Sequence, residues 1–315
     1  MFSVVIPLYN KEKYIRETVQ SVLAQDYKEF EVLIVNDGST DGSLHKLKDI
    51  SDARIKIINQ ENSGVSQARN TGISNASFEW IAFLDGDDVW SPNHLSELKR
   101  IIELFPSSGL ISTQHSKFDR SSELVFKLKT HDSHIRSINY FAEAAKSPSI
   151  VWTSAACISQ KVFNEIGGFS NIRIGEDLEY WVKVALDYPV AISDKVTSYY
   201  RQNTGGAMNT SGYREFCNFS SLSEINAPLS LLVEKAKNDP SIMESPNVIK
   251  YINSILKGDV RSSLYHNNFE MVKQFSKFAI PEKSASFIFL TLVNVTPIRI
   301  TKTAVNAYKK IVKLN

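Results

Sequence analysis

The chain has 315 residues, of which 43% are hydrophobic and 22% charged, so it is long enough for one complete α/β core and an appended segment. Its formal net charge of only +2 argues against a nucleic-acid-binding protein, because such proteins usually carry a strong basic excess. The two cysteines, Cys157 and Cys217, form no CxxC or Cys/His pattern, which argues against a zinc site or a disulfide framework and suits a reducing cytosol.

The first part of the chain alternates short β-branched runs with helical patterns. Between the first two runs, Tyr14, Val19 and Val22 recur at helical spacing while charged residues fall elsewhere, which predicts an amphipathic crossover helix. Strands joined by such crossovers pair in parallel. We therefore predict an α/β fold with a mostly parallel central sheet, whose first strands cover residues 4–8, 31–35, 54–58 and 81–84.

Polar residues follow each of these strands, and the carboxyl edge of an open α/β sheet is where ligands bind. The strongest signal is Asp85-Gly86-Asp87-Asp88, because three carboxylates at one strand end concentrate negative charge. A divalent cation removes this conflict, and carboxylates together with phosphate oxygens suit Mg²⁺ or Mn²⁺. The alternative is a solvated turn, since Asp-Gly is a common turn dipeptide.

A second polar segment, Asn36-Asp37-Gly38-Ser39-Thr40-Asp41, follows the second strand. At a sheet edge, Asp37 is placed to accept a hydrogen bond from a nucleotide base or a ribose. The alternative is an Asx turn that caps the helix after Asp41, because Asp and Ser are favoured caps.

Further along the chain, strand and helix signals continue and then change in character. Residues 94–105, 160–166 and 176–186 predict helices, and residues 109–113 return to the sheet. Beyond about Gly206 the strand signals fade, and residues 229–237 and 247–257 predict helices. We therefore expect one α/β domain at 1–205 and a mainly helical C-terminal region at 206–315.

Together with Val5-Ile6-Pro7-Leu8-Tyr9-Asn10 and residues 62–72, these motifs resemble, in order and spacing, those of family 2 glycosyltransferases. The resemblance runs from Phe2 to about Arg201 and implies the GT-A fold, a Rossmann-like nucleotide-sugar-binding domain. It implies that Pro7, Tyr9 and Asp37 surround the nucleotide base, with Glu12 and Arg69 shaping the same pocket. In the family, the Asp-x-Asp motif, here Asp85-Gly86-Asp87, contacts the donor ribose and the metal on the donor diphosphate, and Asp88 is a further candidate ligand.

The segment Ile174-Gly175-Glu176-Asp177 resembles the acceptor-side signature of the same family. The resemblance implies that Asp177 is the general base that takes the proton from the acceptor hydroxyl, and that Glu176 orients the site. Attack from the face opposite the leaving group inverts the anomeric carbon. A charged first helical turn, favoured by the helix dipole, is a compatible alternative for both residues. We expect Trp181 to pack in the core, as large aromatic side chains usually do.

A basic residue near the end of the resemblance, Arg201, matches a family segment that closes over the diphosphate. Many relatives carry a histidine shortly after this arginine, able to touch the metal, whereas this chain has Asn203 there. We therefore expect Arg201 to act as a cation for the departing diphosphate, without that histidine.

The predicted function is an inverting, metal-dependent glycosyltransferase with Mn²⁺ or Mg²⁺ that moves a hexosyl or N-acetylhexosaminyl group. The donor is a nucleoside-diphosphate sugar, with UDP-sugar favoured, and the acceptor is a glycan or lipid-linked glycan in cell-surface polysaccharide synthesis. The alternatives are a non-catalytic nucleotide-sugar-binding module and a nucleotidyltransferase-like enzyme. An NAD-linked enzyme is disfavoured because no GxGxxG follows the first strand.

We expect a cytoplasmic protein, because the start of the chain lacks signal-peptide features and the longest apolar run, 285–295, is shorter than the roughly 20 residues that span a bilayer. Residues 298–313 predict a basic amphipathic helix, with lysines and Arg299 within one arc. Such a helix suits an anionic surface on the inner face of the membrane. The alternative is that it docks on its own domain with its lysines in water.

Overall fold

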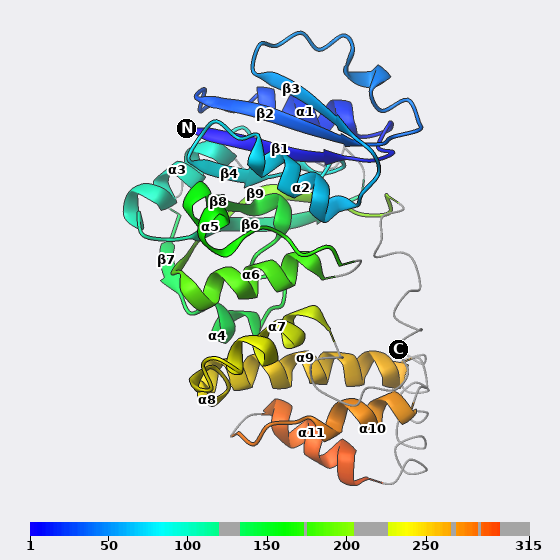
Figure 1. Ribbon diagram of the computed structural model, residues 1–315, viewed down its shortest axis with the longest axis vertical. Coiled ribbons are helices and arrows are strands. Elements are labelled where there is room, and N and C mark those ends of the chain that lie inside the picture. The colour runs from blue at the N-terminus through cyan, green and yellow to red at the C-terminus, as the bar shows by residue number, and fades with distance from the viewer. Residues whose placement is uncertain (120–132, 173–174, 205–225, 266–268, 283–284, 297–315) are drawn as a thin grey trace. The chain divides into compact units, whose positions relative to one another are not determined.

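The computed structural model describes all residues except 120–132, 173–174, 205–225, 266–268, 283–284 and 297–315. It divides into two compact units: Met1–Tyr140 with Ser149–Thr210, and Phe141–Pro148 with Ser211–Asn315 (Figure 1). No helix within the described ranges is both long and apolar enough to cross a membrane. The predicted domain boundary near Gly206 and the predicted basic helix 298–313 lie outside the described residues.

The first unit is built on a nine-stranded sheet, as far as the described residues go. Its main path runs β3-β2-β1-β4-β8-β6-β9-β5, with β7 paired to β9 off this path. The strands are β1 (Phe2–Leu8), β2 (Phe30–Asp37), β3 (Ile55–Gln60), β4 (Trp80–Phe83), β5 (Val89–Trp90), β6 (Leu110–Phe118), β7 (Ile135–Ile138), β8 (Ala156–Ser159) and β9 (Val190–Arg201). The first four pair in parallel, as predicted, whereas β8 pairs antiparallel with β4 and β6, and β9 antiparallel with β5 and β7. The sheet is therefore parallel among its first four strands and mixed beyond β4.

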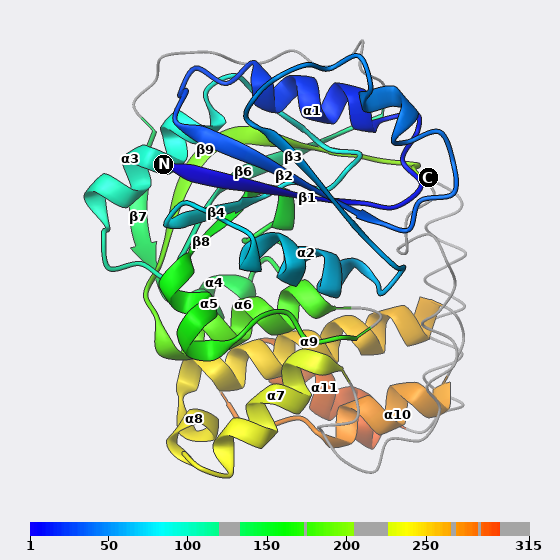
Figure 2. The ribbon, with the colours of Figure 1, turned by 45° about the horizontal axis from the view of Figure 1, so that its top comes forward.

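Helices bury both faces of β1 and β2, which explains why these two strands read as nearly continuous apolar runs. On one face, alternate β1 residues from Val4 to Leu8 share a core with the apolar stripes of α1 (Ile15–Leu23) and α3 (His94–Leu104). On the other face, α2 (Val65–Ser74) packs against β1 and β2, so that α1 and α2 lie on opposite sides of the sheet (Figure 2). A Cβ at Gly72 would come within 2.3 Å of Val5 Cγ1, so glycine permits this close packing.

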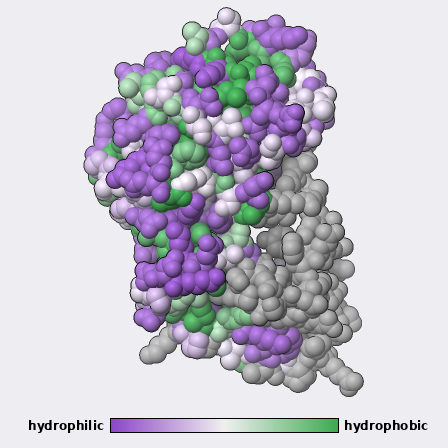
Figure 3. Space-filling model, viewed as in Figure 1, coloured by the Kyte–Doolittle hydropathy of each residue, from purple (hydrophilic) through white to green (hydrophobic). Residues whose placement is uncertain are grey.

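The strand β3 forms one edge of the sheet and is only partly buried. Ile57 is 42% exposed there. Figure 3 shows hydrophobic side chains gathered near the top of the view, where β3 lies in Figure 1. The β-branched residues that predict this strand therefore favour its pairing with β2, although their side chains are only partly buried.

The predicted helices of the second half of this unit are present as α5 (Gln160–Ile166) and α6 (Glu176–Asp187). Ser159 caps α5 by accepting a hydrogen bond from the Val162 backbone N–H. Gly175 precedes α6 in the left-handed region, with φ of 81°, which glycine adopts without strain. Trp181 of α6 is fully buried, so its prediction as a core residue is confirmed.

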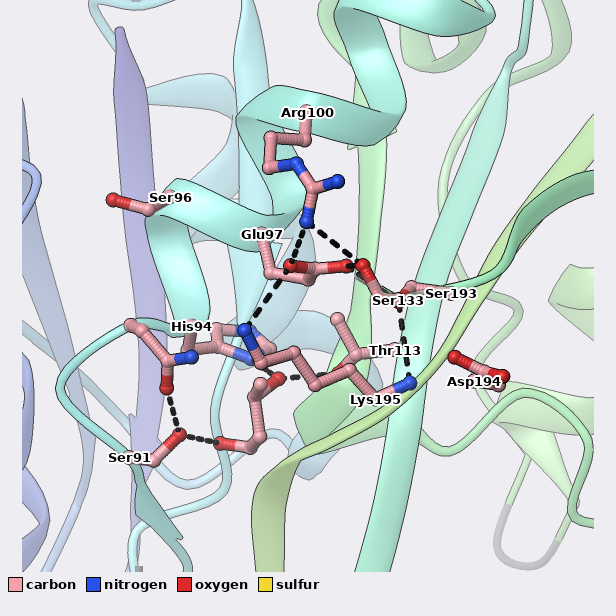
Figure 4. A network of polar contacts seen from close by, with 12 residues as sticks. Ser91, His94, Ser96, Glu97, Arg100, Thr113, Ser133, Ser193, Asp194 and Lys195 are labelled. Carbon is pink, nitrogen blue, oxygen red and sulfur yellow. Dashed lines mark hydrogen bonds and ion pairs between the residues drawn. The ribbon is translucent and has the colours of Figure 1, made fainter. Parts of the chain in front are cut away.

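A buried carboxylate on α3, Glu97, ties that helix to β9 and to the residues before β7 (Figure 4). It accepts hydrogen bonds from Ser133 and, at 2.6 Å, from Ser193 Oγ, and it forms ion pairs with Arg100 and Lys195. Burial alone would raise the pKa of Glu97, but these hydrogen bonds and cations lower it below its ordinary value. The ionised side chain therefore stabilises the fold.

The second unit is helical in its described residues, as predicted. Its helices are α7 (Ala227–Ala236), α8 (Ser241–Glu244), α9 (Pro246–Tyr265), α10 (Phe269–Lys277) and α11 (Ala285–Val295), and it also takes in most of α4 (Tyr140–Ala144). The ring of Phe141 on α4 lies 5.6 Å from that of Tyr251 on α9. Ser254 Oγ donates to the Ala145 carbonyl at 2.6 Å, so the short segment 141–148 packs with helices that follow much later in the chain.

Candidate functional site

The carboxyl ends of β1, β2 and β4 carry the polar motifs that the sequence singles out. Because these strands pair in parallel, their ends meet at one edge of the sheet. There Pro7 is buried within β1, whereas Tyr9, just beyond the strand, is 48% exposed. A Cβ at Gly86 would come within 3.1 Å of the Pro7 carbonyl oxygen, so the motif after β4 lies directly against the end of β1.

Asp37, at the end of β2, is almost fully buried and holds the start of α2. Its Oδ1 accepts hydrogen bonds from Gln60 Nε2 at 2.7 Å and from the Ser63 backbone N–H at 2.8 Å. Its Oδ2 accepts from the Gly64 backbone N–H at 2.9 Å. The carboxylate thus satisfies backbone donors at a helix N-terminus, and a helix-capping role is compatible with a position at the ligand edge.

Glu12 contacts the turn that follows the Asp37 motif. Its Oε2 accepts a hydrogen bond from the Gly42 backbone N–H at 3.2 Å, and its own backbone N–H donates to Asp41 Oδ2 at 3.0 Å. Burial alone would raise the pKa of Asp41, but hydrogen bonds from Ser43 and the backbone lower it. These reciprocal bonds join the segment after β1 to the segment after β2.

The acidic motif after β4 is partly neutralised by two cations from other segments. Arg69 Nη2 donates to Asp85 Oδ1 at 2.8 Å, and Lys11 forms an ion pair with Asp87 Oδ2. In each aspartate the second carboxylate oxygen has no hydrogen-bond partner among the described residues. The side chains of Asp85 and Asp87 remain 32% and 10% exposed, so both keep an oxygen for a ligand.

Asp88 differs from its two neighbours because it is buried and both of its oxygens are engaged. Ser154 Oγ donates to Oδ2 at 2.6 Å, and the Arg201 backbone N–H donates to Oδ1 at 3.0 Å. Burial raises the pKa of Asp88 well above its ordinary range, and the charges of Asp85 and Asp87 raise it further. Burial and the two neighbouring carboxylates therefore favour the protonated form of Asp88.

Arg69 bridges the two halves of the site. Besides its bond to Asp85, its Nη1 donates to Glu176 Oε1 at 3.0 Å, although Arg69 and Glu176 are separated by 107 positions in the sequence. Burial alone would lower the pKa of Arg69, but the charges of Asp85, Glu176 and Asp177 raise it. The pKa of Glu176 is raised by burial and by Asp177, against the lowering effect of Arg69. One buried guanidinium thus links the acidic motif after β4 to the start of α6.

Asp177, in the first turn of α6, is half-buried and positioned by a neighbouring threonine. Thr153 Oγ1 donates to Asp177 Oδ2 at 2.9 Å, and the Leu178 backbone N–H donates to Oδ1 at 2.8 Å. The residue after Thr153 is Ser154, which binds Asp88. Two adjacent side chains on the short helix η3 (Thr153–Ala155) therefore connect to the start of α6 and to the acidic motif.

Arg201 is buried and held by several partners. Its Nε donates to the Asp87 backbone carbonyl at 2.9 Å, and its Nη2 pairs with Glu17 Oε2 at 2.7 Å. The guanidinium also lies over the rings of Tyr14 and Phe118. Its predicted role as a cation for the diphosphate stays a prediction, since these contacts already account for much of its hydrogen-bonding capacity. Asn203 follows with φ of 60° and donates to Asp119 Oδ1 at 3.0 Å.

The residues present fit a divalent cation that shares its ligands with a substrate. No group of three or more His, Cys, Asp or Glu side chains arranged to hold a metal occurs among the described residues. Mg²⁺ and Mn²⁺ commonly take only one or two protein carboxylates and complete their shell with phosphate and water. Asp85 and Asp87 each offer one unengaged oxygen, and the ammonium of Lys11 already lies against Asp87, where positive charge is favoured.

The sequence motifs did not reveal four residues that this site uses: Lys11, Glu17, Thr153 and Ser154. Each contacts a predicted site residue from a distant part of the chain. For Lys11, the only signal in the sequence is that a basic residue stands two positions after Tyr9. For Thr153 and Ser154, no local spacing predicts the contact.

Comparison with known proteins identifies relatives of this chain. Residues 3–167 match the family model "Glycosyl transferase family 2". An uncharacterized glycosyltransferase of Rickettsia conorii is 33% identical over 211 residues, which cover 64% of this chain and 33% of that protein. Glycosyltransferase GlyA of Streptococcus pneumoniae is 44% identical over 186 residues, covering 56% of this chain and 26% of that protein. An uncharacterized glycosyltransferase of Rickettsia felis is 29% identical over 313 residues, or 94% of this chain and 48% of that protein. The chain thus spans no more than about half the length of these relatives.

Two solved structures share the fold. TarS of Staphylococcus aureus, in complex with UDP-GlcNAc, superposes with a TM-score of 0.66 at 19% identity, covering 98% of this chain and 91% of that one. The mannosyltransferase PcManGT of Pyrobaculum calidifontis, in complex with GDP-Man and Mn²⁺, gives 0.56 at 18% identity, covering 97% and 84%. At these identities the likeness establishes a common architecture.

Proposed function

Because the chain belongs to glycosyl transferase family 2, we propose that it transfers a sugar from a nucleoside-diphosphate sugar to a hydroxyl group of an acceptor. The observation that carries the proposal is the Arg69 bridge, which brings the acidic motif after β4 and the Glu176-Asp177 pair into one site. A donor-binding edge and a candidate general base are then side by side, as group transfer requires.

The donor would lie across the carboxyl ends of β1, β2 and β4. Tyr9 offers an exposed side chain for a nucleotide base, Pro7 lies two residues before it in β1, and Asp37, Glu12 and Arg69 shape the surrounding loops. Asp85 and Gly86 would face the ribose and diphosphate, with Arg201 behind them. We favour a UDP-sugar and a hexosyl or N-acetylhexosaminyl group for this chain, while TarS is described in complex with UDP-GlcNAc and PcManGT with GDP-Man.

Asp87 is the preferred metal ligand because it retains an unengaged oxygen beside the exposed part of the acidic motif. Asp85 is placed to assist, whereas the engaged oxygens of Asp88 favour an anchoring role for that residue. A bound Mn²⁺ or Mg²⁺ would neutralise charge on the leaving diphosphate. Lys11, paired to Asp87, would supply further positive charge to the same side of the site.

Asp177 would accept the proton of the acceptor hydroxyl while that oxygen attacks the anomeric carbon. Its Oδ2 is oriented by Thr153, and Glu176 is oriented by Arg69, so both carboxylates are held before the acceptor arrives. Attack from the side opposite the diphosphate inverts the anomeric configuration. General-base assistance of this kind typically contributes roughly 10²- to 10⁴-fold to the rate.

The acceptor we favour is a glycan or a lipid-linked glycan, and the process a cell-surface polysaccharide synthesis at the inner face of the cytoplasmic membrane. The basic segment 298–313 supports this through its composition alone. A non-catalytic nucleotide-sugar-binding module and a nucleotidyltransferase-like enzyme are the competing functions.

The test is a titration of the protein with a panel of nucleotide sugars, with and without Mn²⁺ or Mg²⁺, followed by calorimetry and by release of nucleoside diphosphate. We expect metal-dependent binding of one donor and slow release of its diphosphate. Asp177→Asn should abolish turnover but keep donor binding, and Asp87→Asn should weaken metal-dependent binding. Asp187→Asn, an exposed carboxylate at the far end of α6, is the matched control and should change neither.

Saturable donor binding without any diphosphate release would favour the binding module. Near-normal turnover by Asp177→Asn would show that another group removes the proton. If no donor binds in the presence of either metal ion, the transferase proposal is wrong.

A further inference from the structure

Three aromatic side chains from separate parts of the chain pack against one another beside the candidate base. His115 of β6 lies parallel to Trp152, with ring centroids 4.7 Å apart and planes at 22°. Tyr200 of β9 lies 4.6 Å from the same Trp152 ring at 55°. The indole N–H of Trp152 has no hydrogen-bond partner among the described residues, so stacking holds this ring in place.

This cluster, His115-Trp152-Tyr200, differs from the other large aromatic cluster of the unit. Phe83, Phe169, Tyr180 and Trp181 also pack ring against ring, but all four are buried in the core. His115, Trp152 and Tyr200 are only half-buried. Aromatic side chains that remain partly exposed can contact a ligand.

The cluster borders both the acceptor side and the donor side of the site. Trp152 immediately precedes Thr153, whose hydroxyl binds Asp177, and Ser154, whose hydroxyl binds Asp88. On the other side, Tyr200 immediately precedes Arg201, whose backbone N–H donates to Asp88 Oδ1 at 3.0 Å.

We propose that His115, Trp152 and Tyr200 form a platform on which the acceptor lays the C–H face of a carbohydrate ring, so that one of its hydroxyls reaches Asp177. This inference rests on the proposed transfer reaction and names the chemical class of its acceptor. A pyranose ring has an apolar face of C–H groups and a rim of hydroxyls, which matches stacked rings beside polar side chains. Burial, with a smaller contribution from the charge of Lys117, lowers the pKa of His115, so its ring stacks on Trp152 in the neutral form at neutral pH.

The test uses Trp152→Ala and the ring-preserving Trp152→Phe, with Tyr188→Ala as the matched control. Tyr188 is another half-buried aromatic residue of the same unit, whose hydroxyl contacts Glu165. The probes are the methyl glycosides of glucose, galactose, mannose and N-acetylglucosamine. Their binding is measured by calorimetry, and diphosphate release from the donor is measured with each glycoside and with water alone as acceptor.

We expect Trp152→Ala to weaken glycoside binding and to raise the glycoside KM by about tenfold or more, which corresponds to about 1.4 kcal/mol. Trp152→Phe should recover most of this loss, and Tyr188→Ala should match the wild type. Tyr188→Ala should also keep donor hydrolysis with water within about twofold of wild type, because Tyr188 lies outside the proposed platform.

Two outcomes would overturn the platform: no glycoside of the panel binds the wild-type protein, or Trp152→Ala binds and uses glycosides as the wild type does. A protein that releases no diphosphate from any donor would instead count against the proposed transfer reaction. Calorimetry with the glycosides alone would still decide the platform in that case.

Discussion

Arg69 gives the sharpest prediction, since a single buried guanidinium joins two parts of the site. Arg69→Met keeps most of the side-chain volume and removes both ion pairs. Its side chain is 4% exposed, that of Glu176 14% and that of Asp85 32%, so both carboxylates lose their partner while still largely shielded from water.

Breaking a buried ion pair by removing one partner typically costs about 3–5 kcal/mol, and the partial exposure of Asp85 places this variant near about 3 kcal/mol. For a unit of this size such a loss lowers Tm by about 6–12 °C. Burial already raises the pKa of Glu176, and loss of Arg69 removes the charge that opposes this rise. Glu176 should therefore become protonated over a wider pH range.

Arg69→Lys tests whether a positive charge at this position is sufficient without the two-sided guanidinium contact. A lysine ammonium retains the positive charge but lacks the planar fork that reaches two carboxylates at once. We expect a smaller loss of about 1–2 kcal/mol, with donor-hydrolysis kcat falling by about tenfold because Asp85 and Glu176 are no longer held together.

The assay is thermal unfolding by calorimetry, together with diphosphate release at saturating donor. Arg16→Met is the control, because Arg16 is 46% exposed and its pair with Asp49 spans 3.8 Å, which predicts a change below about 1 kcal/mol. If Arg69→Met melts within about 2 °C of the wild type, or if Arg69→Lys keeps full activity, the Arg69 bridge does not have the role described above.

Three further changes test other parts of the structure. Thr153→Val should lower kcat by about tenfold with donor KM unchanged, and Thr153→Ser should restore it in steady-state kinetics, because only the hydroxyl orients Asp177; loss in both variants would indicate packing alone. The pKa of Glu97 is lowered, so the stability that Glu97 contributes is present above its ordinary pKa of 4.5 and is lost as pH falls. The difference in Tm between wild type and Glu97→Gln should therefore be largest near about pH 7 and disappear toward about pH 3. A difference that does not change with pH would contradict this. Burial raises the pKa of Asp259 on α9 from 3.8 to about 7, so the stability that depends on Asp259 is greatest below pH 3.8 and is lost as pH rises through about 7. Asp259→Asn should remove this pH dependence of Tm between about pH 5 and 8. A variant whose Tm follows the wild-type pH curve would refute the prediction.

Local hydrophobic periodicity predicts the helices and strands on which the site is built. The helix expected at 160–166 is α5, with the same bounds, and the strands expected at 4–8 and 81–84 are β1 and β4 within a few residues. The GT-A fold that the motifs imply is confirmed by the family match and by the likeness to TarS.

The contacts that join the motifs are not predictable in the same way. Arg69 is identified from its motif as a pocket residue, but its bridge to Glu176 spans 107 positions and depends on how α2 and α6 pack. Thr153 and Ser154 stand at positions where no periodicity or spacing signals their partners. The mixed pairing of the strands after β4 has the same origin, since strand direction is set by connections that short apolar runs do not specify.

The segment 141–148 has a practical consequence for how this protein can be divided. Phe141, only 7% exposed, packs on Tyr251, and Ala145 accepts a hydrogen bond from Ser254. The family match, 3–167, includes this segment but none of the α9 residues that cover it. A fragment trimmed to the family boundary would therefore carry an uncovered apolar helix face inside its own sequence and would be prone to aggregate. Segment 141–148 belongs to the helical unit although it lies inside the family match, so the two units should be expressed as one piece.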